Sequence, residues 1–548
     1  MNMLRKDIYV HPSADLLGRD LLNALHRLVP VNFKDCSNLA ACVQGHDVLS
    51  LSGEDRVLGE MSKSGLRCFH VANRVAEPRS ENAGEPVRFG VSECLDKFLR
   101  GRRVQHQAVP NLSGVRTEPG DEVLAVYGEK PVWVLRRSGG SAVQIVSAGL
   151  PQLTGSEKPF DYLNGYHFIQ LLPLLHFLRE VTSELGWTRP PLRACFTFDD
   201  SNLHWLSYGF LSYPELIQQA RKDRFHVTFA TVPLDGWGLH SRTVRLFKEN
   251  PEQLSLMIHG NNHTRDELGQ ARTLDGHLQL MAQSLCRIER LERATGLHVN
   301  RVMVPPFEAL SVGAMVAMLA LGFEGASLSP WSLRYWNPER AWPAGFGIEI
   351  AEMTDGGFPV LARYQLSDAC EGPAVISAFL GLPIVLVEHH KAVARGIELL
   401  SHAASVINSL GDVRWCSTET MLRSNYLSRW EGTTLWMKPY SCRVELHVPH
   451  GISSVVVAPM GDTDDGGLAD FALICNRRDG EDGKVWIRSG APISVLEGDG
   501  IRLISTKLGT IDYRQLKKPK SSVWPLSRRL LCEVRDRLVA LMPGPRKA

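Results

Sequence analysis

The sequence predicts a mixed α/β protein of several domains, and three observations support this prediction. Its 548 residues exceed what one hydrophobic core usually organises, on a scale of roughly 100 to 200 residues per domain. Short apolar runs alternate with helical patterns as far as about residue 428. Beyond Trp430, β-rich segments are separated by Gly and Asp clusters. We therefore expect an N-terminal open α/β sheet domain over 1–187, a β/α barrel over 190–428, an antiparallel β-sandwich over 430–512 and a basic amphipathic helical tail over 513–548.

The N-terminal segment has the pattern of an open parallel sheet. Runs such as DIYV (Asp7–Val10) and PVWVLRR (Pro131–Arg137) have the length of buried strands. Neither GxGxxG nor GxxxxGK[ST] occurs, and SGGS (Ser138–Ser141) is more typical of a hairpin turn than of a phosphate loop. The pattern loosely resembles Rossmann-like or glutamine-amidotransferase-like domains. No cysteine stands in a nucleophile-elbow context, so that likeness concerns architecture only.

The central segment contains fully apolar runs, each followed by a helical pattern. Such runs are typical of parallel strands buried on both sides, as in a β/α barrel. The runs are ACFTF (194–198), HVTFATV (226–232), LSLMIH (254–259), NRVMVP (300–305) and LPIVLVEH (382–389). In such a barrel the side chains at the carboxyl ends of the strands converge on a shared site.

Three polar motifs stand at these predicted strand ends. TFDD ends in Asp199 and Asp200, two adjacent carboxylates that suit metal ligation and proton abstraction; a helix N-cap is an equally frequent use of such a pair. HGNNH places His259 and His263 four residues apart, a spacing that lets two imidazoles meet one cation but that also occurs by chance. PPF (305–307) and the later EHH (388–390) follow two further strands.

The order of these motifs resembles that of the polysaccharide deacetylase family over some 230 residues of the central domain. The resemblance implies a barrel of the deacetylase type with Asp199 as general base. Asp200, His259 and His263 would hold the divalent metal. The backbone N–H of Phe307 would help to form an oxyanion hole, where one donor contributes about 3 kcal/mol. His389 or His390 would be the general acid, and strand alternation points only one of them into the barrel.

The metal implied by the resemblance is zinc, although cobalt, nickel or iron would also suit one carboxylate and two imidazoles. It would lower the pKa of water and polarise the acyl oxygen while Asp199 accepts the proton.

The sequence departs from the family at three places. The family has Arg just before Pro-Pro, paired with the base, and Val304 stands here. The second residue of HxxxH is commonly Ser or Thr, and here it is Gly260. WSLRYWNPERAW (331–342) supplies aromatics where the family has a Trp-Asp segment, with Glu339 as its only carboxylate.

Aromatic and His residues in the loops near these motifs are candidates for binding a sugar. His204 and Trp205 follow the two aspartates, and Trp331 and Trp336 lie in the aromatic segment. Rings of this kind stack on sugars, but they also pack under long loops, which is their more frequent role.

The C-terminal segment from Arg514 is strongly basic, with ten basic and two acidic side chains. Leu526, Leu530, Val534 and Leu538 would share one side of a helix. Such a helix either packs against the body of the protein or a partner, which we favour, or makes a peripheral contact with an anionic membrane.

Composition limits the remaining choices. The net charge of +2 gives no reason to expect a nucleic-acid partner. Eleven scattered cysteines without a CxxC pair predict neither a disulfide framework nor a thiolate zinc site. The charged start MNMLRKDIYV leaves no room for an apolar signal peptide, so a reducing, cytoplasmic location is expected.

The leading hypothesis is a metal-dependent amide hydrolase that removes an acyl group, most simply acetyl, from an N-acylated sugar or glycoconjugate. The sugar is implied by the family resemblance alone. The alternatives are a hydrolase of another non-peptide C–N bond on the same scaffold, and a catalytically inactive carbohydrate-binding relative, which Val304 would favour.

Overall fold

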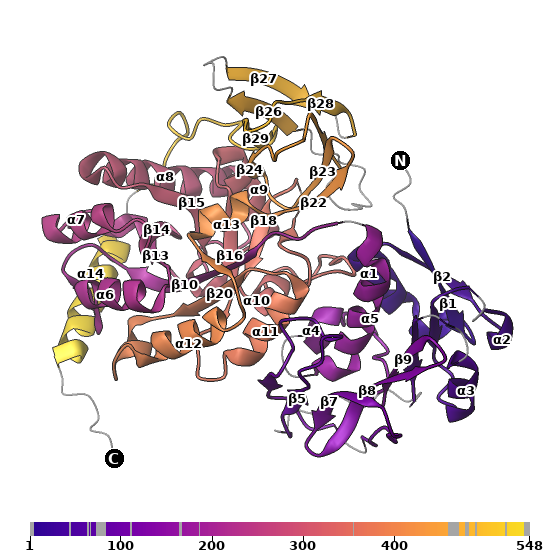
Figure 1. Ribbon diagram of the computed structural model, residues 1–548. Coiled ribbons are helices and arrows are strands. Elements are labelled where there is room, and N and C mark those ends of the chain that lie inside the picture. Colours follow the sequence, from indigo (N-terminus) through magenta and orange to yellow (C-terminus); the bar gives the residue numbers. More distant parts are fainter. Residues whose placement is uncertain are drawn as a thin grey trace. The chain divides into compact units, whose positions relative to one another are not determined.

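The computed structural model describes residues 5–42, 45–62, 65, 67–72, 84–109, 112–163, 167–185, 187–354, 356–458, 471–476, 482–487, 490–520 and 523–541 (Figure 1). The chain divides into two compact units. The first comprises Met1–Trp187 with Trp342–Glu349 and Glu371–Leu380. The second comprises Thr188–Ala341, Ile350–Cys370 and Gly381–Ala548. The mixed α/β class predicted from the sequence is confirmed.

The first unit is organised around a nine-stranded sheet of order β2-β1-β3-β4-β9-β8-β7-β5-β6. Its strands are β1 (Lys6–His11), β2 (Val31–Asp35), β3 (Val48–Ser50), β4 (Arg67–Val71), β5 (Val87–Phe89), β6 (Arg103–Val104), β7 (Glu122–Tyr127), β8 (Lys130–Ser138) and β9 (Ser141–Val146). Pairing is parallel from β2 to β9, as predicted, and antiparallel from β9 to β6. The predicted SGGS turn explains the change, because it joins β8 to β9 directly as a hairpin without a crossover helix.

Helices of the first unit include the deeply buried α5, whose apolar side chains explain its place in the core. Their bounds are α1 (Arg19–Leu28), α2 (Leu39–Cys42), α3 (Leu58–Met61), α4 (Pro159–Leu163), α5 (Leu172–Thr182) and α11 (Glu371–Leu380). A disulfide joins Cys36 to Cys42, a single bridge that the sequence analysis did not predict. The two cysteines are six residues apart at the end of β2 and in the short α2, which brings their Cα atoms to 6.2 Å.

The second unit contains a ring of mostly parallel strands. The order is β17-β18-β16-β15-β14-β13-β10-β20-β19, with β21 paired to the start of β10. β18 pairs with β16, and β19, two residues further along the chain, pairs with β20, so this one stretch of chain joins both edges of the sheet. The strands are β10 (Leu192–Ser201), β13 (Val227–Thr231), β14 (Leu254–His259), β15 (Val299–Val304), β16 (Gly325–Leu328), β17 (Glu352–Met353), β18 (Pro359–Ala362), β19 (Tyr364–Gln365), β20 (Ile384–Glu388) and β21 (Val413–Trp415).

Helices connect the strands of this ring, and most begin at a side-chain cap that the sequence provides. Thr273, for example, accepts the backbone N–H of Gly276 at the start of α8, and Gly296 ends that helix in a left-handed conformation. The helices are α6 (Tyr213–Asp223), α7 (Ser241–Glu249), α8 (Leu274–Thr295), α9 (Val312–Leu321), α10 (Pro330–Tyr335), α12 (Glu398–Asn408) and α13 (Thr418–Arg423). A small hairpin of β11 (Ser207–Tyr208) and β12 (Leu211–Ser212) follows β10.

Two four-stranded sheets follow the ring, and side chains from both form one apolar core. The strands are β22 (Tyr426–Glu431), β23 (Thr434–Pro439), β24 (Arg443–His447), β25 (Ser454–Val457), β26 (Phe471–Asn476), β27 (Asp482–Ile487), β28 (Pro492–Ser494) and β29 (Gly500–Ser505). The pairing is not wholly antiparallel as expected, because β23 and β25 run parallel. β24 lies between them in sequence and joins the other sheet, which allows β25 to return in the direction of β23.

The C-terminal tail forms α14 (Val523–Leu541), coloured yellow in Figure 1. Arg546 and Lys547, two of the basic residues counted in the tail, lie outside the described residues. Among the described helices, none has both the length and the apolar character needed to cross a bilayer.

Candidate metal centre

The two aspartates of TFDD lie at an irregularity near the end of β10. The pairing register between β10 and β13 shifts between Phe198 and Ser201, and Asp200 has a left-handed φ of 66°. A bulge of this kind interrupts the alternation of side chains. Asp199 and Asp200 can therefore both reach groups at the carboxyl end of the ring, which an undistorted strand would not allow.

The two histidines of HGNNH lie at the end of β14 and in the loop that follows. The buried carboxylate of Glu267 accepts the backbone N–H groups of Asn261, Asn262 and His263 at 2.7 to 3.2 Å. Gly260 has a φ of 60°, and a Cβ there would lie 2.2 Å from Oε1 of Glu267 and 2.5 Å from Cγ of Pro306. The glycine that departs from the family pattern is thus required by the carboxylate that shapes this loop.

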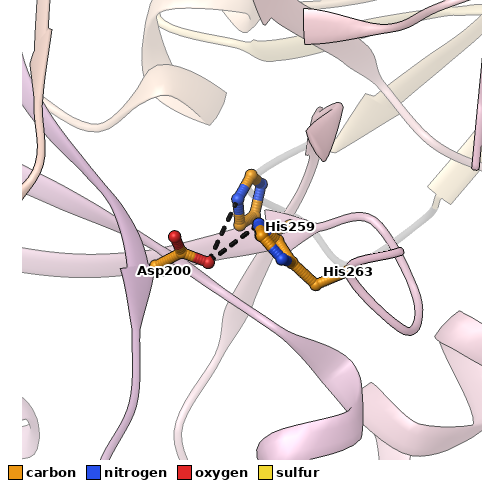
Figure 2. Close-up of side chains that lie close together, drawn as sticks. All are labelled: Asp200, His259 and His263. Carbon is orange, nitrogen blue, oxygen red and sulfur yellow. Dashed lines mark ion pairs between the residues drawn. The ribbon is translucent and has the colours of Figure 1, made fainter. Parts of the chain in front are cut away.

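Asp200, His259 and His263 converge as predicted, with one potential ligand atom from each within 4.8 Å of the others. Figure 2 shows the Asp200 carboxylate directed at both imidazoles. Its Oδ1 lies 2.8 Å from Nε2 of His263 and 3.7 Å from Nε2 of His259. One carboxylate and two imidazole nitrogens are a donor set that divalent zinc, cobalt, nickel or iron accepts, so the residues fit a cation.

The protonation of these groups also suits a cation. Burial lowers the pKa of His259 to about 4, against the opposing pull of the Asp199 carboxylate, so the ring is neutral at pH 7. Its Nδ1 donates to the carbonyl of Val304 at 2.9 Å, which leaves the Nε2 lone pair facing Asp200. Burial would raise the pKa of Asp200, but His263, His259 and Arg529 outweigh it and hold that pKa well below 3.8.

Asp199 lies beside this cluster and is paired with a buried arginine that the sequence reasoning missed. Arg363 donates from Nη1 to Oδ1 of Asp199 at 3.0 Å, and its Nη2 lies 2.9 Å from Oδ2. The other side of the guanidinium donates to Glu308, which Ser329 and Ser332 also hydrogen-bond. Burial would raise the pKa of Asp199, but Arg363 and then His259 outweigh it and hold the pKa below 3.8, so the carboxylate is ionised at neutral pH.

Arg363 stands between β18 and β19, in the stretch that joins the two edges of the sheet. It supplies the positive charge that Val304 cannot supply. Val304 itself is fully buried in the apolar core. No local pattern could have identified Arg363, because it is separated from Asp199 by 164 positions in the sequence.

The PPF turn follows β15, and Phe307 in it has a left-handed φ of 55°. Its ring centroid lies 5.7 Å from that of His263, and 57% of the residue is exposed. The turn therefore lies beside the metal cluster at a place that solvent reaches.

The two histidines after β20 have different surroundings. Nε2 of His389 lies 3.9 Å from Oδ2 of Asp200, and its side chain is 53% exposed. His390 is 3% exposed, packs edge-on against Tyr208 and has its Nε2 3.8 Å from Asp536. Only His389 thus combines proximity to the metal cluster with access to solvent.

The four residues expected to bind a sugar have different surroundings. Trp205 is exposed and lies under the guanidinium of Arg537, and Trp331 is exposed with Tyr364 edge-on to it. His204 is held by the backbone carbonyl of Asp235 at 2.9 Å and by the ring of Trp237. Trp336 is half-buried against Tyr335.

The C-terminal helix α14 reaches the same cluster, which the sequence did not indicate. Arg529 donates from Nη1 to Oδ1 of Asp200 at 3.1 Å and from Nε to Asp235 at 3.2 Å. Nη2 of Arg528 lies 2.9 Å from Nδ1 of His263. A cation at Nε2 of His263 needs a proton on Nδ1, so Arg528 would have to release that nitrogen.

No family model matches the sequence, and no curated protein matches it significantly. Similar solved structures include a Mycobacterium smegmatis protein assigned to the polysaccharide deacetylases, at 17% identity and a TM-score of 0.32; the match covers 43% of this chain and 90% of that one. The peptidoglycan deacetylase PdaC of Bacillus subtilis is similar at 12% identity and a TM-score of 0.24, over 42% of this chain and 90% of that one. Both are described as deacetylases of polysaccharide or peptidoglycan, the class that the sequence motifs resemble.

Proposed function

We propose that this protein is a metal-dependent hydrolase that removes an acyl group, most simply acetyl, from an N-acylated sugar or glycoconjugate. The observation that supports it is the convergence of Asp200, His259 and His263 beside the separately paired carboxylate of Asp199. One carboxylate is placed to hold a cation and the other stays free of it. This division of roles is what hydrolysis by activated water requires.

Asp200, His259 and His263 would hold the cation, and zinc is the first choice for this donor set. When bound, such a cation supplies a Lewis acid that polarises the acyl oxygen and activates water. Asp199 is ionised and fixed by a hydrogen bond and an ion-pair contact from Arg363, so it is the general base. His389 is half-exposed beside Asp200, so it is the general acid towards the leaving amine. The backbone of Phe307, in the exposed turn after β15, is the oxyanion donor.

A sugar is the proposed substrate because exposed aromatic rings belong to the loops that carry the site. Trp205 follows Asp200 in the chain, and Phe307 packs beside His263. Flat rings of this kind suit the apolar faces of pyranoses. We retain Trp205 and Trp331 as sugar-binding residues, whereas the bonded His204 and the half-buried Trp336 have structural roles.

A hydrolase of another C–N bond is the second candidate, because nothing in the donor set itself selects an acetamide. The case for an inactive relative rested on Val304, and the pairing of Arg363 with Asp199 weakens it.

The test measures acetate release by the full-length protein from a panel of N-acetylated oligosaccharides, with ureides and N-acyl amines as the comparison. We expect release from the glycans that a chelator abolishes and Zn²⁺ or Co²⁺ restores. Hydrolysis confined to the other substrates would support the second candidate. A protein that binds the metal stoichiometrically and hydrolyses none of them would contradict both.

A further inference from the structure

One face of α14 contacts the site through polar side chains. Besides Arg528 and Arg529, described above, Glu533 accepts from Nδ2 of Asn202 at 2.7 Å. Asp536 lies 3.8 Å from His390, and the guanidinium of Arg537 lies 4.6 Å from the centre of the Trp205 ring. The helix is therefore held in place by charge and hydrogen bonds, with both acidic residues of the tail directed at the body of the protein.

The opposite face of α14 is apolar and exposed. At 100° per residue, its members occupy an arc of roughly 160°. The inward residues Arg529, Glu533 and Asp536 lie outside that arc, and Arg537 lies just inside its edge, next to Leu526. Seven large hydrophobic side chains are exposed there, namely Val523, Trp524, Leu526, Leu530, Leu531, Val534 and Leu538. The sequence predicted that four of these share one side of the helix. The helix does dock on the body of the protein, but through its polar side chains and not through this side.

An amphipathic helix usually buries its apolar stripe and exposes its polar face. In α14 the polar face is the buried one and the apolar face is exposed. A continuous exposed apolar patch of this kind is typical of a surface that binds a protein or a membrane. The polar contacts hold α14 in place, and its apolar side chains remain exposed.

The charge around the patch indicates what it binds. Lys517 and Lys520 just before α14 are exposed, and so is Arg535 on the helix, which pairs with Asp536 at 2.7 Å. Glu533 and Asp536, the two acidic residues of the tail, are both turned inward. Exposed basic side chains together with exposed Leu and Trp side chains are the composition of a helix that lies in the interface of an anionic membrane.

We propose that α14 docks its apolar face on an anionic membrane, and that the substrate is the N-acylated sugar headgroup of a lipid in that membrane. The substrate class rests on the proposed function. Residues on the inward face touch Asp200 and His263 directly, so the metal cluster lies about one helix diameter, roughly 10 to 12 Å, from the apolar face. A helix that sinks about 5 to 10 Å into the interface would bring the site to the level of the headgroups.

The docking is tested by flotation of the full-length protein with vesicles of phosphatidylcholine alone or with about one third phosphatidylglycerol. We expect binding to the anionic vesicles and at least tenfold weaker binding by the double variant Leu531→Glu, Val534→Glu. Leu496→Glu is the matched control, because Leu496 is 61% exposed in a loop outside α14 and Leu531 is 64% exposed on the helix. The control should bind as the wild type does.

A second variant leaves α14 itself unchanged. Lys517→Glu with Lys520→Glu should weaken binding to the anionic vesicles severalfold and leave binding to phosphatidylcholine alone unchanged. Unaltered metal stoichiometry in all variants shows that the inward face and the fold are intact.

The docking proposal is overturned if wild-type protein does not float with anionic vesicles, or if the Leu531 and Val534 variant binds them as well as the control. It is also overturned if the apolar face instead joins two copies, seen as a dimer in light scattering that the same variant dissociates. Acetate release from an N-acetylated glycolipid in vesicles, several times faster than from its soluble glycan, supports the substrate class, and equal rates overturn it. Vesicle binding without hydrolysis of any substrate would contradict the proposed function alone.

Discussion

The two ends of the strand ring differ in a way that shows what defines the site. At the amino ends, a cavity of about 930 Å³ is lined by charged and polar side chains, including His226, His298 and Glu419. These groups satisfy one another or the backbone: His226 bonds the carbonyl of Glu252 and the hydroxyl of Ser255, and His298 bonds Glu419. At the carboxyl ends, Asp200, His259 and His263 instead direct three ligand atoms at one another. The size of a cavity is thus a poorer guide to the site than the convergence of ligands.

The largest effect is expected from removing a metal ligand. Asp200→Ala should lose the bound metal and lower acetate release by about 10³-fold or more, because the Lewis acid and its activated water are lost together. Metal analysis and a hydrolysis assay check this result. His298→Ala, at the opposite end, is the matched control and should keep both metal and activity. Equal losses in the two variants would show that the distinction between the ends is mistaken.

Asp199→Asn separates the base from the ligands. The variant should keep its metal, because Asp199 is bonded to Arg363 and is not one of the three ligands. It should lose about 10²- to 10⁴-fold in kcat, the usual contribution of a general base. Full activity, or loss of the metal, would show that the roles of the two aspartates are wrongly divided.

Arg363→Met tests whether the charge beside Asp199 acts on the base. Without it, burial would raise the pKa of Asp199, so the acidic limb of the pH profile of kcat should move to higher pH. The variant should also lose about 3 kcal/mol of unfolding free energy, because the buried Asp199 carboxylate is left without its ion-pair partner. Arg301→Met is the control, since Arg301 makes a two-fold contact with Glu292 near the amino end of β15. It should leave the acidic limb where it is in the wild type.

The smallest effect concerns the pH dependence of folding stability. The contribution of Asp199, at the carboxyl ends of the strands, and that of His298, at the amino ends, should change with pH in opposite directions. Asp199 has a lowered pKa, so its stabilising contribution is present above about pH 4 and is lost as the pH falls through the folded-state value. The hydrogen bond to Glu419 raises the pKa of His298 above 6.5, so its contribution is present below pH 6.5 and is lost as the pH rises through the folded-state value.

Thermal melts of His298→Ala and wild type between about pH 5 and 8 check the second case. The His298 side chain is 62% exposed, and solvent screens such a pair, so we expect a difference of at most a few tenths of a kcal/mol. This difference should shrink towards the alkaline end, and a difference that grows with pH would contradict the assignment.

The sequence was informative where function is encoded locally. Asp200, His259 and His263 each follow an apolar strand, and parallel strands bring their carboxyl ends together whatever their separation in the chain. The parallel half of the first sheet and the SGGS hairpin follow from patterns within a few residues.

The features of the site that the sequence did not predict depend on contacts between segments far apart in the chain. Arg363 and Arg529 reach Asp199 and Asp200 across 164 and 329 positions, and no spacing or periodicity records such pairs. The choice between His389 and His390 required the packing of Tyr208 against one of them. The exposed face of α14 shows the limit of amphipathic patterns, which define a stripe without saying whether protein, lipid or water covers it.

Arg363 lies between β18 and β19, where one stretch of chain pairs first with β16 and then with β20. This position has a consequence for recognising relatives of this protein. A criterion that inspects the residue before Pro-Pro would classify a chain with Val304 as disabled. The guanidinium of Arg363 nevertheless reaches the Asp199 carboxylate from the segment between β18 and β19. Searches for chains with such a strand-end aspartate should therefore ask which cation lies beside it in space, because the pair can join residues far apart in the sequence.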